Sequence, residues 1–470
     1  MKCPRCPVNP DLPCVGERHA PVCLDVASGK PGRAAQLVAI SEGLPSPPPP
    51  DPDPDFRPRF DPTDGRVRVG LWMPCMNLGG AETWQLSLIR SIDADRIAWT
   101  GAVVTDGRAG TDPGMAAEHA RSMPVGYGMH AARRLAEASD VILSWSTLDL
   151  AAELAGIATR PAIVHCSHFD SSHHFPEEIA DWLTPTDRWA AVSDVAREWV
   201  HPRFRDRTSI IWNAVDPDRL AVRRSRAEMR RAWGVPDGLK VAGYLGRFSP
   251  EKDPRAMLRL AQVMPAGWIA VAVGGGAELA PIREAAHPRL ILPGPDLAAG
   301  DVLGAFDALV VPSLQESFGL TIAEGLWVGV PVISTPVGLA AMVPGLTREV
   351  PIGATGPELA AAVAEGPEAA RIARGMAFAR ERLTLERFGR EWSDLLCSAA
   401  EGRRPAPGID PAVRDAVLTC PDRGPEGGLA LLDEERTCCG GGPELTACKA
   451  GKGDRPGRVK LPECLACKSA

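Results

Sequence analysis

The chain has 470 residues, of which 45% are hydrophobic and 24% charged, and its formal net charge is −7. This composition is typical of a soluble globular protein, the acidic balance disfavours nucleic acid as the main partner, and the length predicts two domains with extensions. No apolar stretch approaches the roughly 18–20 residues of a membrane span, and the start MKCPRCPVNP lacks the apolar core of a secretory signal, so we expect a cytoplasmic protein, with peripheral membrane contact left open.

The first 64 residues form two segments of different character. Residues 1–40 contain a cysteine cluster, Cys3, Cys6, Cys14 and Cys23. Clustered cysteines in a reducing compartment favour metal binding, and four thiolates with a C-x2-C pair predict a structural zinc site. Residues 41–64 are rich in proline, which cannot donate a sheet hydrogen bond, so we expect an extended linker.

From Arg66 onward, short apolar runs alternate with alanine-rich helical stretches. Runs of this kind, bounded by Gly, Pro or Ser, predict parallel strands buried on both faces. The predicted strands are 66–73, 99–105, 141–146, 162–167, 189–193 and 209–213, then 241–246, 268–275, 289–294, 308–313 and 331–336. We therefore predict an α/β fold of two doubly wound Rossmann-like domains, 65–225 and 226–398, facing each other across a cleft. Ligands should bind beyond the carboxyl ends of the strands.

The loop GRFSPEKDP follows the strand predicted at 241–246 and carries two cations. Arg247 and Lys252 precede Asp253-Pro254, which we predict to be the N-cap and first residue of a helix. Cations beside a helix N-terminus favour a diphosphate. The alternative is that both are solvated surface side chains.

The stretch QESFGLTIAEGL follows the strand predicted at 308–313 and holds two glutamates. Glu316 lies in a loop, Gly319 allows close backbone approach, and a helix from about Leu320 carries Glu324. Carboxylates accept hydrogen bonds from hydroxyls, so the two could bind a sugar and a ribose of one ligand. Two solvated helix-surface acids are the alternative.

Two loops of the first half also carry polar or flexible residues. In NLGGAETW, Gly79 and Gly80 either admit a ligand close to the backbone or form a left-handed turn, and the GxGxxG dinucleotide signature is absent. Four histidines occur within IVHCSHFDSSHHF: His165, His168, His173 and His174. Neither a Cys pair nor HExxH spacing supports zinc, so we predict a polar or acid–base histidine, with surface histidines as the alternative.

The Gly/Pro/Cys-rich tail, residues 399–470, contains a second cysteine cluster. Its spacing includes another C-x2-C pair and predicts a structural zinc site on Cys439, Cys448, Cys464 and Cys467. Unstructured thiols, or one site shared by both chain ends, are the alternatives.

Taken in order, five of these segments resemble glycosyltransferase family 4, the retaining GT-B enzymes that use nucleotide-sugar donors. The likeness covers roughly 66–395 and is carried by NLGGAETW, AAVSDVAREWV, IIWNAVDPDRL, GYLGRFSPEKDP and VVPSLQESFGLTIAEGLWVGVPVISTPVG. The last contains an E-x7-E pattern, Glu316 and Glu324. Departures are Ala214 for the usual glycine and Gly338-Leu339 for a glycine pair.

The resemblance implies a role for each matching residue. Arg247 and Lys252 would hold the donor diphosphate, and Glu316 would face the transferred sugar. Glu324 would bind the ribose, with amides of Phe318 and Gly319 near sugar and phosphate, Gly79 and Gly80 lining the donor side, and His168 as the cleft histidine.

The implied activity is transfer of a sugar from a UDP- or GDP-sugar to a glycan, lipid or protein acceptor, with retention and without a catalytic metal. Two alternatives stay open: a nucleotide-sugar epimerase on the same fold, and a non-catalytic nucleotide-sugar-binding protein. The sequence does not distinguish the base, the sugar, the linkage or the oligomeric state.

Overall fold

The computed structural model describes residues 55–401 except 62, 77–78, 106–110, 146–160, 169–185, 286 and 297. The eight cysteines of the two predicted zinc sites, and His173 and His174, lie outside the described residues. Within them, no group of three or more His, Cys, Asp or Glu side chains is arranged to hold a metal ion. None of the described helices is both long and apolar enough to cross a bilayer.

The chain divides into two compact units. Described residues up to 192, Ala196–Ile211 and 390–401 belong to the first unit, and Ser193–Val195 with Trp212–Gly389 form the second. The division therefore falls at 211/212, whereas the sequence placed it at 225/226. The sequence also placed 390–398 in the second domain, and the packing of α18 described below accounts for that difference.

The first unit is built on a seven-stranded parallel sheet in the order β3-β2-β1-β4-β5-β6-β7. The strands are β1 Val67–Met73, β2 Ile97–Val104, β3 Val125–Tyr127, β4 Val141–Ser144, β5 Ala162–Ser167, β6 Arg188–Ala191 and β7 Thr208–Ile210. All six strands predicted for this half are present. The sequence missed β3, a three-residue edge strand without an apolar run.

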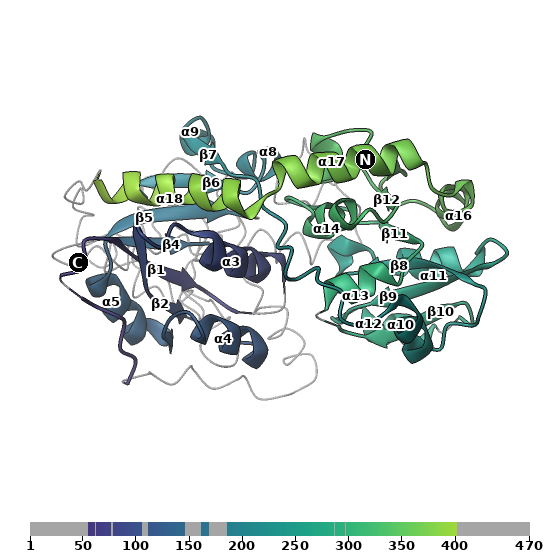
Figure 1. The fold of residues 1–470 in the computed structure, drawn as a ribbon, viewed down its shortest axis with the longest axis horizontal. Helices are drawn as coiled ribbons and strands as arrows, with labels where there is room; N and C mark the ends of the chain where they lie inside the picture. The colour runs from purple at the N-terminus through teal and green to yellow at the C-terminus, as the bar shows by residue number, and fades with distance from the viewer. Residues whose placement is uncertain are drawn as a thin grey trace, which may run out of the picture. The chain divides into compact units, whose positions relative to one another are not determined.

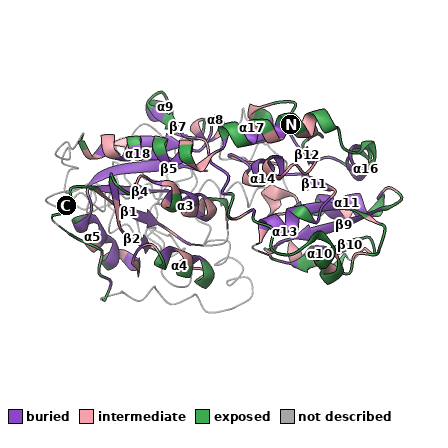
Figure 2. Ribbon diagram, viewed as in Figure 1, coloured by how far each residue is buried: buried purple, intermediate pink, exposed green. Residues whose placement is uncertain are grey.

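Helices cover this sheet, and its strands are largely buried (Figure 2). The helices of the first unit are α3 Gly80–Ser91, α4 Pro113–Ala120, α5 Gly128–Ala138, α8 Asp194–Arg197, which begins in the second unit, and α9 Pro202–Arg205. Residues of α5 such as Leu135 pack with Ile142 and Trp72 in one apolar cluster. Phe56 joins the same cluster and is 4% exposed, so the predicted proline-rich linker, 41–64, contains a residue of the core. A Cβ at Gly126 would collide with the Phe56 ring.

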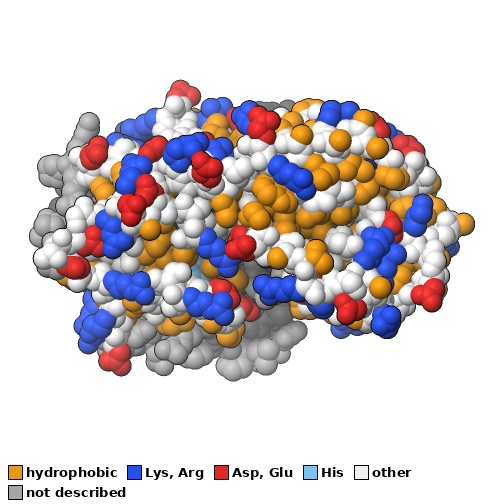
Figure 3. All heavy atoms as spheres, in the orientation of Figure 1, with side chains coloured by type: hydrophobic (Ala, Val, Ile, Leu, Met, Phe, Trp, Pro, Cys, Tyr) orange, Lys and Arg blue, Asp and Glu red, His pale blue; other side chains and the backbone are white. Residues whose placement is uncertain are grey.

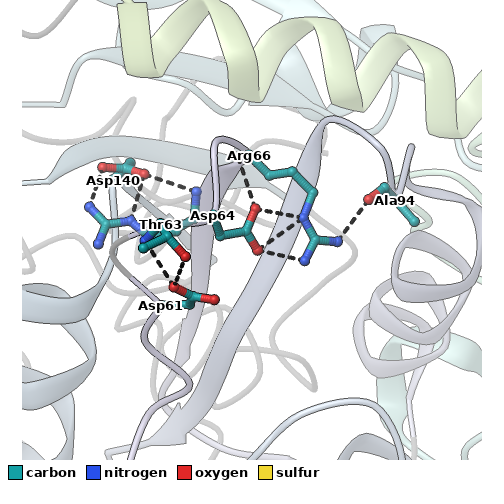
Figure 4. A network of polar contacts seen from close by, with 7 residues as sticks. Asp61, Thr63, Asp64, Arg66, Ala94 and Asp140 are labelled. Carbon is teal, nitrogen blue, oxygen red and sulfur yellow. Dashed lines mark hydrogen bonds and ion pairs between the residues drawn. The ribbon is translucent and has the colours of Figure 1, made fainter.

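Arginine–aspartate contacts tie the amino end of β1 to its neighbours (Figure 4). Arg66 pairs with Asp64 at 2.6 Å and donates to the Ala94 carbonyl oxygen at 2.9 Å. Arg68 donates from Nε and Nη2 to the two carboxylate oxygens of Asp140, at 2.9 and 2.7 Å. Asp140 immediately precedes β4, so this two-point contact holds β1 beside β4 at the end opposite to the carboxyl ends.

The second unit is built on a six-stranded parallel sheet in the order β10-β9-β8-β11-β12-β13 (Figure 1). Its strands are β8 Lys240–Leu245, β9 Trp268–Val273, β10 Leu290–Gly294, β11 Ala308–Val311, β12 Val332–Ser334 and β13 Arg348–Glu349. The five strands predicted for this half are present, and β13, a polar two-residue edge strand, was missed. Both sheets reverse their strand order at one point, as doubly wound sheets do. The predicted α/β class is confirmed.

Helices pack on both faces of this second sheet. They are α10 Arg226–Trp233, the 3₁₀ turn η4 Pro250–Lys252, α11 Arg255–Gln262, α12 Leu279–Glu284, α13 Ala299–Gly304, α14 Leu320–Val328, α15 Leu339–Met342, α16 Gly356–Glu365 and α17 Ala369–Arg382. Met257 of α11 and Val363 of α16 join strand residues such as Ala270 in the largest apolar cluster described for this unit. On the other face α14 packs against β11, β12 and α17. On the molecular face drawn in Figure 3, side chains of both charge signs are interspersed.

Helix α18, Leu385–Glu401, starts in the second unit and ends in the first. Trp392 is fully buried there, with its ring centroid 5.3 Å from that of Trp84 on α3. The Asp93 backbone N–H donates to the hydroxyl of Ser393 at 3.0 Å, and Arg96 pairs with the exposed Asp394 at 2.7 Å. Burial of one large aromatic side chain therefore assigns the end of this helix to the first unit.

Removing that side chain should destabilise the first unit. We expect Trp392→Ala to lower its free energy of unfolding by about 3–5 kcal/mol, because the truncation leaves a cavity in the core. The control Asp394→Ala removes only an exposed ion pair and should cost less than about 1 kcal/mol. Urea unfolding followed by circular dichroism measures both. Equal effects of the two substitutions would contradict this account of α18.

Candidate active site

The second sheet reverses its strand order between the parallel neighbours β8 and β11, and the candidate active site lies beyond their carboxyl ends. The two strands are neighbours, with Ala308 opposite Ala242 and Leu309 opposite Gly243. Open parallel sheets bind ligands at such a point because the loops that follow the two strands diverge there. Here these are the loop carrying Arg247 and Lys252 and the loop carrying Glu316.

A direct contact joins the two loops. Lys252 Nζ lies 2.6 Å from Glu316 Oε2, and the side chains are 20% and 11% exposed. Ser313, at the end of β11, donates its hydroxyl to Glu316 Oε1 at 2.9 Å. The backbone adds a further link, since the Leu314 N–H donates to the Glu251 carbonyl oxygen at 2.8 Å. Two predicted site residues 64 positions apart are thus brought together.

Arg247 lies on the same loop but is paired differently. Its Nη2 is 3.2 Å from Glu251 Oε1, and about half of its side chain is exposed. Ser249 donates to the same carboxylate oxygen at 2.5 Å. Burial acts to raise the pKa of Glu251, but the Arg247 charge, the Ser249 hydrogen bond and the Lys252 charge together hold it below its usual value. The sequence did not single out Glu251, an anion that pairs with Arg247 and whose charge also interacts with that of Lys252.

Glycines after β9 support the Arg247 loop from behind. A Cβ at Gly274, where φ is +149°, would collide with the Gly246 carbonyl oxygen, and one at Gly276 would lie 2.5 Å from that of Phe248. These glycines belong to the stretch VGGGAEL, residues 273–279. Its glycines are required because two loops pack backbone to backbone.

The predicted N-cap pair Asp253-Pro254 is wrong by one position. Helix α11 begins at Arg255 with Pro254 as its N-cap, and no side chain caps it. Asp253 instead ends the 3₁₀ turn in a left-handed conformation, with φ at 45°. Its carboxylate accepts from Arg259 at 2.6 and 3.2 Å, which accounts for a non-glycine residue here. Lys252 therefore projects from a tight turn.

Glu324 lies on α14, as predicted, but its partner is unexpected. The side chain is 5% exposed, and Arg219 donates from Nε to Glu324 Oε1 at 2.8 Å. Helix α14 begins at Leu320, and Gly319 before it has a φ of +84°, which favours glycine. The sequence gave no signal for Arg219, because it lies 105 positions from Glu324 in a separate turn.

Gly338 fixes the backbone of the Glu316 loop. The Leu339 N–H donates to the Phe318 carbonyl oxygen at 2.6 Å. With φ at +51°, a Cβ at Gly338 would lie 2.5 Å from that oxygen and 2.9 Å from the Glu316 Cβ. This residue appeared in the sequence only as the surviving member of a glycine pair, and the structure shows a steric requirement for it.

In the first unit, Gly79 and Gly80 open α3. Gly79 is extended, with φ −158° and ψ 179°, so the left-handed-turn alternative is wrong for it. Its carbonyl oxygen accepts from the Thr83 N–H at 3.1 Å and the Thr83 hydroxyl at 2.9 Å. Trp84 of the same helix meets His168 with 4.7 Å between ring centroids. The structure therefore brings the diglycine helix and the predicted histidine together.

His168 follows β5 and is 8% exposed, among Trp84 and Trp145. Burial, with a smaller effect of His165, lowers the pKa of His168 to about 3. His168 is therefore a neutral imidazole at physiological pH, which argues against the acid half of its predicted acid–base role. His165, from the same histidine-containing stretch, is also buried, with Nδ1 3.2 Å from the Ser144 hydroxyl.

The family model described as glycosyl transferases group 1 matches residues 239–365. That range contains the Arg247, Lys252, Glu316 and Glu324 arrangement described above. Residues 239–365 are a group 1 glycosyl transferase domain. The predicted family relationship is thus confirmed at the level of group 1.

Curated proteins that this chain resembles are glycosyltransferases by name. It is 31% identical over 196 residues to the 2-deoxystreptamine glucosyltransferase of Streptomyces kanamyceticus, covering 39% of this chain and 49% of that protein. It is 29% identical over 154 residues to the D-inositol 3-phosphate glycosyltransferase of Mycolicibacterium smegmatis, covering 30% and 34%. The matches span half the length of these relatives or less.

Solved structures extend the likeness to both units. Anabaena Alr3699/HepE in complex with UDP-glucose matches with a TM-score of 0.59 and 19% identity, over 71% of this chain and 100% of that chain. A glycosyltransferase from Rickettsia africae ESF-5 matches with a TM-score of 0.60 and 13% identity, over 72% and 100%. At such identities the likeness concerns the fold. The chain has the GT-B fold, as predicted.

Gly338→Ala should destabilise the second unit more than an unhindered glycine does. We expect a loss of about 2–4 kcal/mol in the free energy of unfolding, because strain and a clash with the Phe318 carbonyl add. Gly345→Ala is the matched control: its φ is +85° with open space around it, so only strain of about 1–2 kcal/mol applies. Urea unfolding checks both, and equal losses would count against a steric role for Gly338.

Burial of His168 predicts a pH effect on stability. The unfolded chain protonates this side chain below pH 6.5, while the folded chain keeps it neutral down to about pH 3, so its contribution falls as pH falls between those values. Between pH 7.5 and 5, wild type should lose about 2 kcal/mol relative to His168→Gln. Unfolding in urea across this range measures the difference. The control His130→Gln alters an exposed histidine and should track wild type, whereas matching profiles for wild type and His168→Gln would refute the prediction.

Proposed function

We propose that the protein is a retaining glycosyltransferase of family 4 that transfers a sugar from a UDP- or GDP-sugar to a hydroxyl acceptor. The observation that carries this proposal is the 2.6 Å contact between Lys252 and Glu316 at adjacent strand ends of a group 1 domain. It sets a cation suited to a diphosphate beside a carboxylate suited to sugar hydroxyls. A nucleotide-sugar donor is supported by the fold neighbour solved with UDP-glucose.

Binding of the donor would redistribute these charges. A diphosphate beside Lys252 competes with Glu316 for the ammonium N–H groups, and Arg247, half exposed, adds a second cation. Glu316 keeps the Ser313 hydrogen bond and offers its other oxygen to a sugar hydroxyl. The amides of Phe318 and Gly319, at the start of α14, would face sugar and phosphate. From the resemblance we further propose that Gly79, Gly80 and a neutral His168 contribute donor-side contacts.

The reaction itself exchanges one bond at the anomeric carbon. The bond from that carbon to the diphosphate oxygen breaks, and a bond to the acceptor oxygen forms on the same face. The acceptor proton passes to the departing phosphate oxygen. Negative charge grows on the diphosphate in the transition state, where Arg247 and Lys252 stabilise it without a catalytic metal.

The proposal extends to the acceptor, the cellular location and the chain ends. The relatives named for 2-deoxystreptamine and inositol 3-phosphate favour a hydroxyl-bearing acceptor, whether glycan, lipid or another molecule. We propose a cytoplasmic location, with peripheral membrane contact left open, and structural zinc on the two terminal cysteine clusters. The domain limits 65–225 and 226–398 stay proposals for the functional division of the chain.

Donor binding and transfer test this function together. UDP- and GDP-sugars are screened by thermal shift, since a bound donor raises the melting temperature. Lys252→Ala and Glu316→Ala should each lower kcat/KM by at least about 100-fold, because each removes a fixed group that contacts the reacting donor. Arg255→Ala is the control, since this nearby cation is exposed and paired with Glu278.

Near-normal transfer by both variants would defeat the site assignment. No shift with either donor class would defeat the donor assignment. Conversion of the donor without any acceptor present would favour the epimerase alternative.

A further inference from the structure

We propose that Arg219 is a positioning residue that holds the Glu324 carboxylate ready to accept the ribose hydroxyls of the nucleotide. This inference rests on the proposed function, in which Glu324 binds the ribose. It adds a residue that lies outside the 239–365 match and that the sequence did not single out. The observation behind it is the 2.8 Å hydrogen bond from Arg219 Nε to Glu324 Oε1, made to a carboxylate that is only 5% exposed.

The backbone around Arg219 is held from two sides. Asp216 accepts from the Asp218 N–H at 3.0 Å, and the Leu220 N–H donates to the Pro217 carbonyl oxygen at 3.0 Å, which closes a tight turn. On the far side Gly300 of α13 packs so closely that a Cβ there would collide with the Leu220 carbonyl oxygen. A side chain leaving such a fixed turn reaches Glu324 with little freedom to move away.

The geometry leaves one carboxylate oxygen for a ligand. Arg219 donates to Oε1 and not to Oε2. A carboxylate oxygen has two lone pairs, so Oε2 and the second lone pair of Oε1 can accept vicinal hydroxyls. The ion pair also fixes the rotation of the carboxylate, because a guanidinium donates in a rigid plane.

Charge gives Arg219 a second effect. An ionised carboxylate that is buried without a partner takes up a proton instead of remaining charged, and it then loses acceptor capacity. The charge of Glu324 in turn raises the pKa of Arg219 above its already high value, so the guanidinium stays charged at any working pH. Without Arg219, the Glu324 carboxylate would lack this counter-charge, and ribose recognition should weaken.

The test measures by calorimetry the binding of UDP and of its 2′-deoxy and 3′-deoxy analogues. If GDP is the preferred nucleotide, GDP and its two deoxy analogues are used instead. Wild type should bind the ribonucleotide at least about tenfold more tightly than one of the deoxy analogues, since a hydrogen bond to a charged acceptor is lost. In Arg219→Gln this ratio should approach one, as in Glu324→Gln.

Two further variants separate positioning from general damage to the fold. Arg224→Gln removes a similar contact, from Arg224 Nε to the buried Asp301 at 2.8 Å, and should keep the wild-type ratio. Arg219→Lys keeps the charge without the planar fork and should retain part of the discrimination, which tests the inference even where Arg219→Gln folds poorly.

The possible results distinguish the role of Arg219, the ribose role of Glu324 and the proposed function. A wild-type ratio in Arg219→Gln together with its loss in Glu324→Gln overturns the role of Arg219 and leaves the proposed function standing. Equal loss in Arg224→Gln also overturns it, since the effect is then structural. Equal binding of ribo- and deoxynucleotides by wild type overturns the ribose role of Glu324 and this inference with it, and binding of neither UDP nor GDP overturns the proposed function itself.

Discussion

The ion pair between Lys252 and Glu316 is the interaction on which the candidate site depends. Both side chains are largely shielded from water. An unpaired charge is costly in such surroundings, and here each charge neutralises the other. The pair exists only because β8 and β11 are neighbours in a parallel sheet and their following loops start at the same edge. The link from Leu314 to Glu251 holds those loops in register. The chemistry of the site is thus a consequence of strand order.

Each cation and each carboxylate of the candidate site has a charged partner within the protein. Arg247 pairs with Glu251, Lys252 with Glu316 and Glu324 with Arg219. Such pairing orders long side chains, so less rotamer entropy remains to be lost when a ligand binds. An anionic ligand must in turn compete with Glu251 and Glu316 for the two cations. The site is therefore ordered and nearly neutral, which differs from a bare basic patch.

Glycines have a comparable role through sterics. Gly338 lets one loop lie against the Phe318 carbonyl, and Gly274 and Gly276 let another lie against the Arg247 loop. Each would carry a Cβ into a backbone oxygen if substituted. In the first unit, packing of Trp84 on His168 links the start of α3 to the end of β5 in the same way, by direct contact between segments distant in sequence.

Much of this protein could be read from its amino-acid order, because the signals involved are local. Short apolar runs bounded by Gly, Pro or Ser predict parallel strands, and the eleven predicted strands are all present. The resemblance of five segments to glycosyltransferase family 4 indicated a glycosyltransferase. The edge strands β3 and β13 were missed since they are short and carry no such run. Both Glu316 and Lys252 could be singled out as candidate site residues because they follow buried strands.

Only the tertiary structure decided the contacts between distant segments. These are the Arg219–Glu324 pair, the Arg247–Glu251 pair, the close packing that requires glycine at position 338, and the burial of Trp392 in the first unit. A partner 105 positions away leaves no periodicity in the sequence, and the contact forms only when the fold brings the turn of Arg219 beside helix α14.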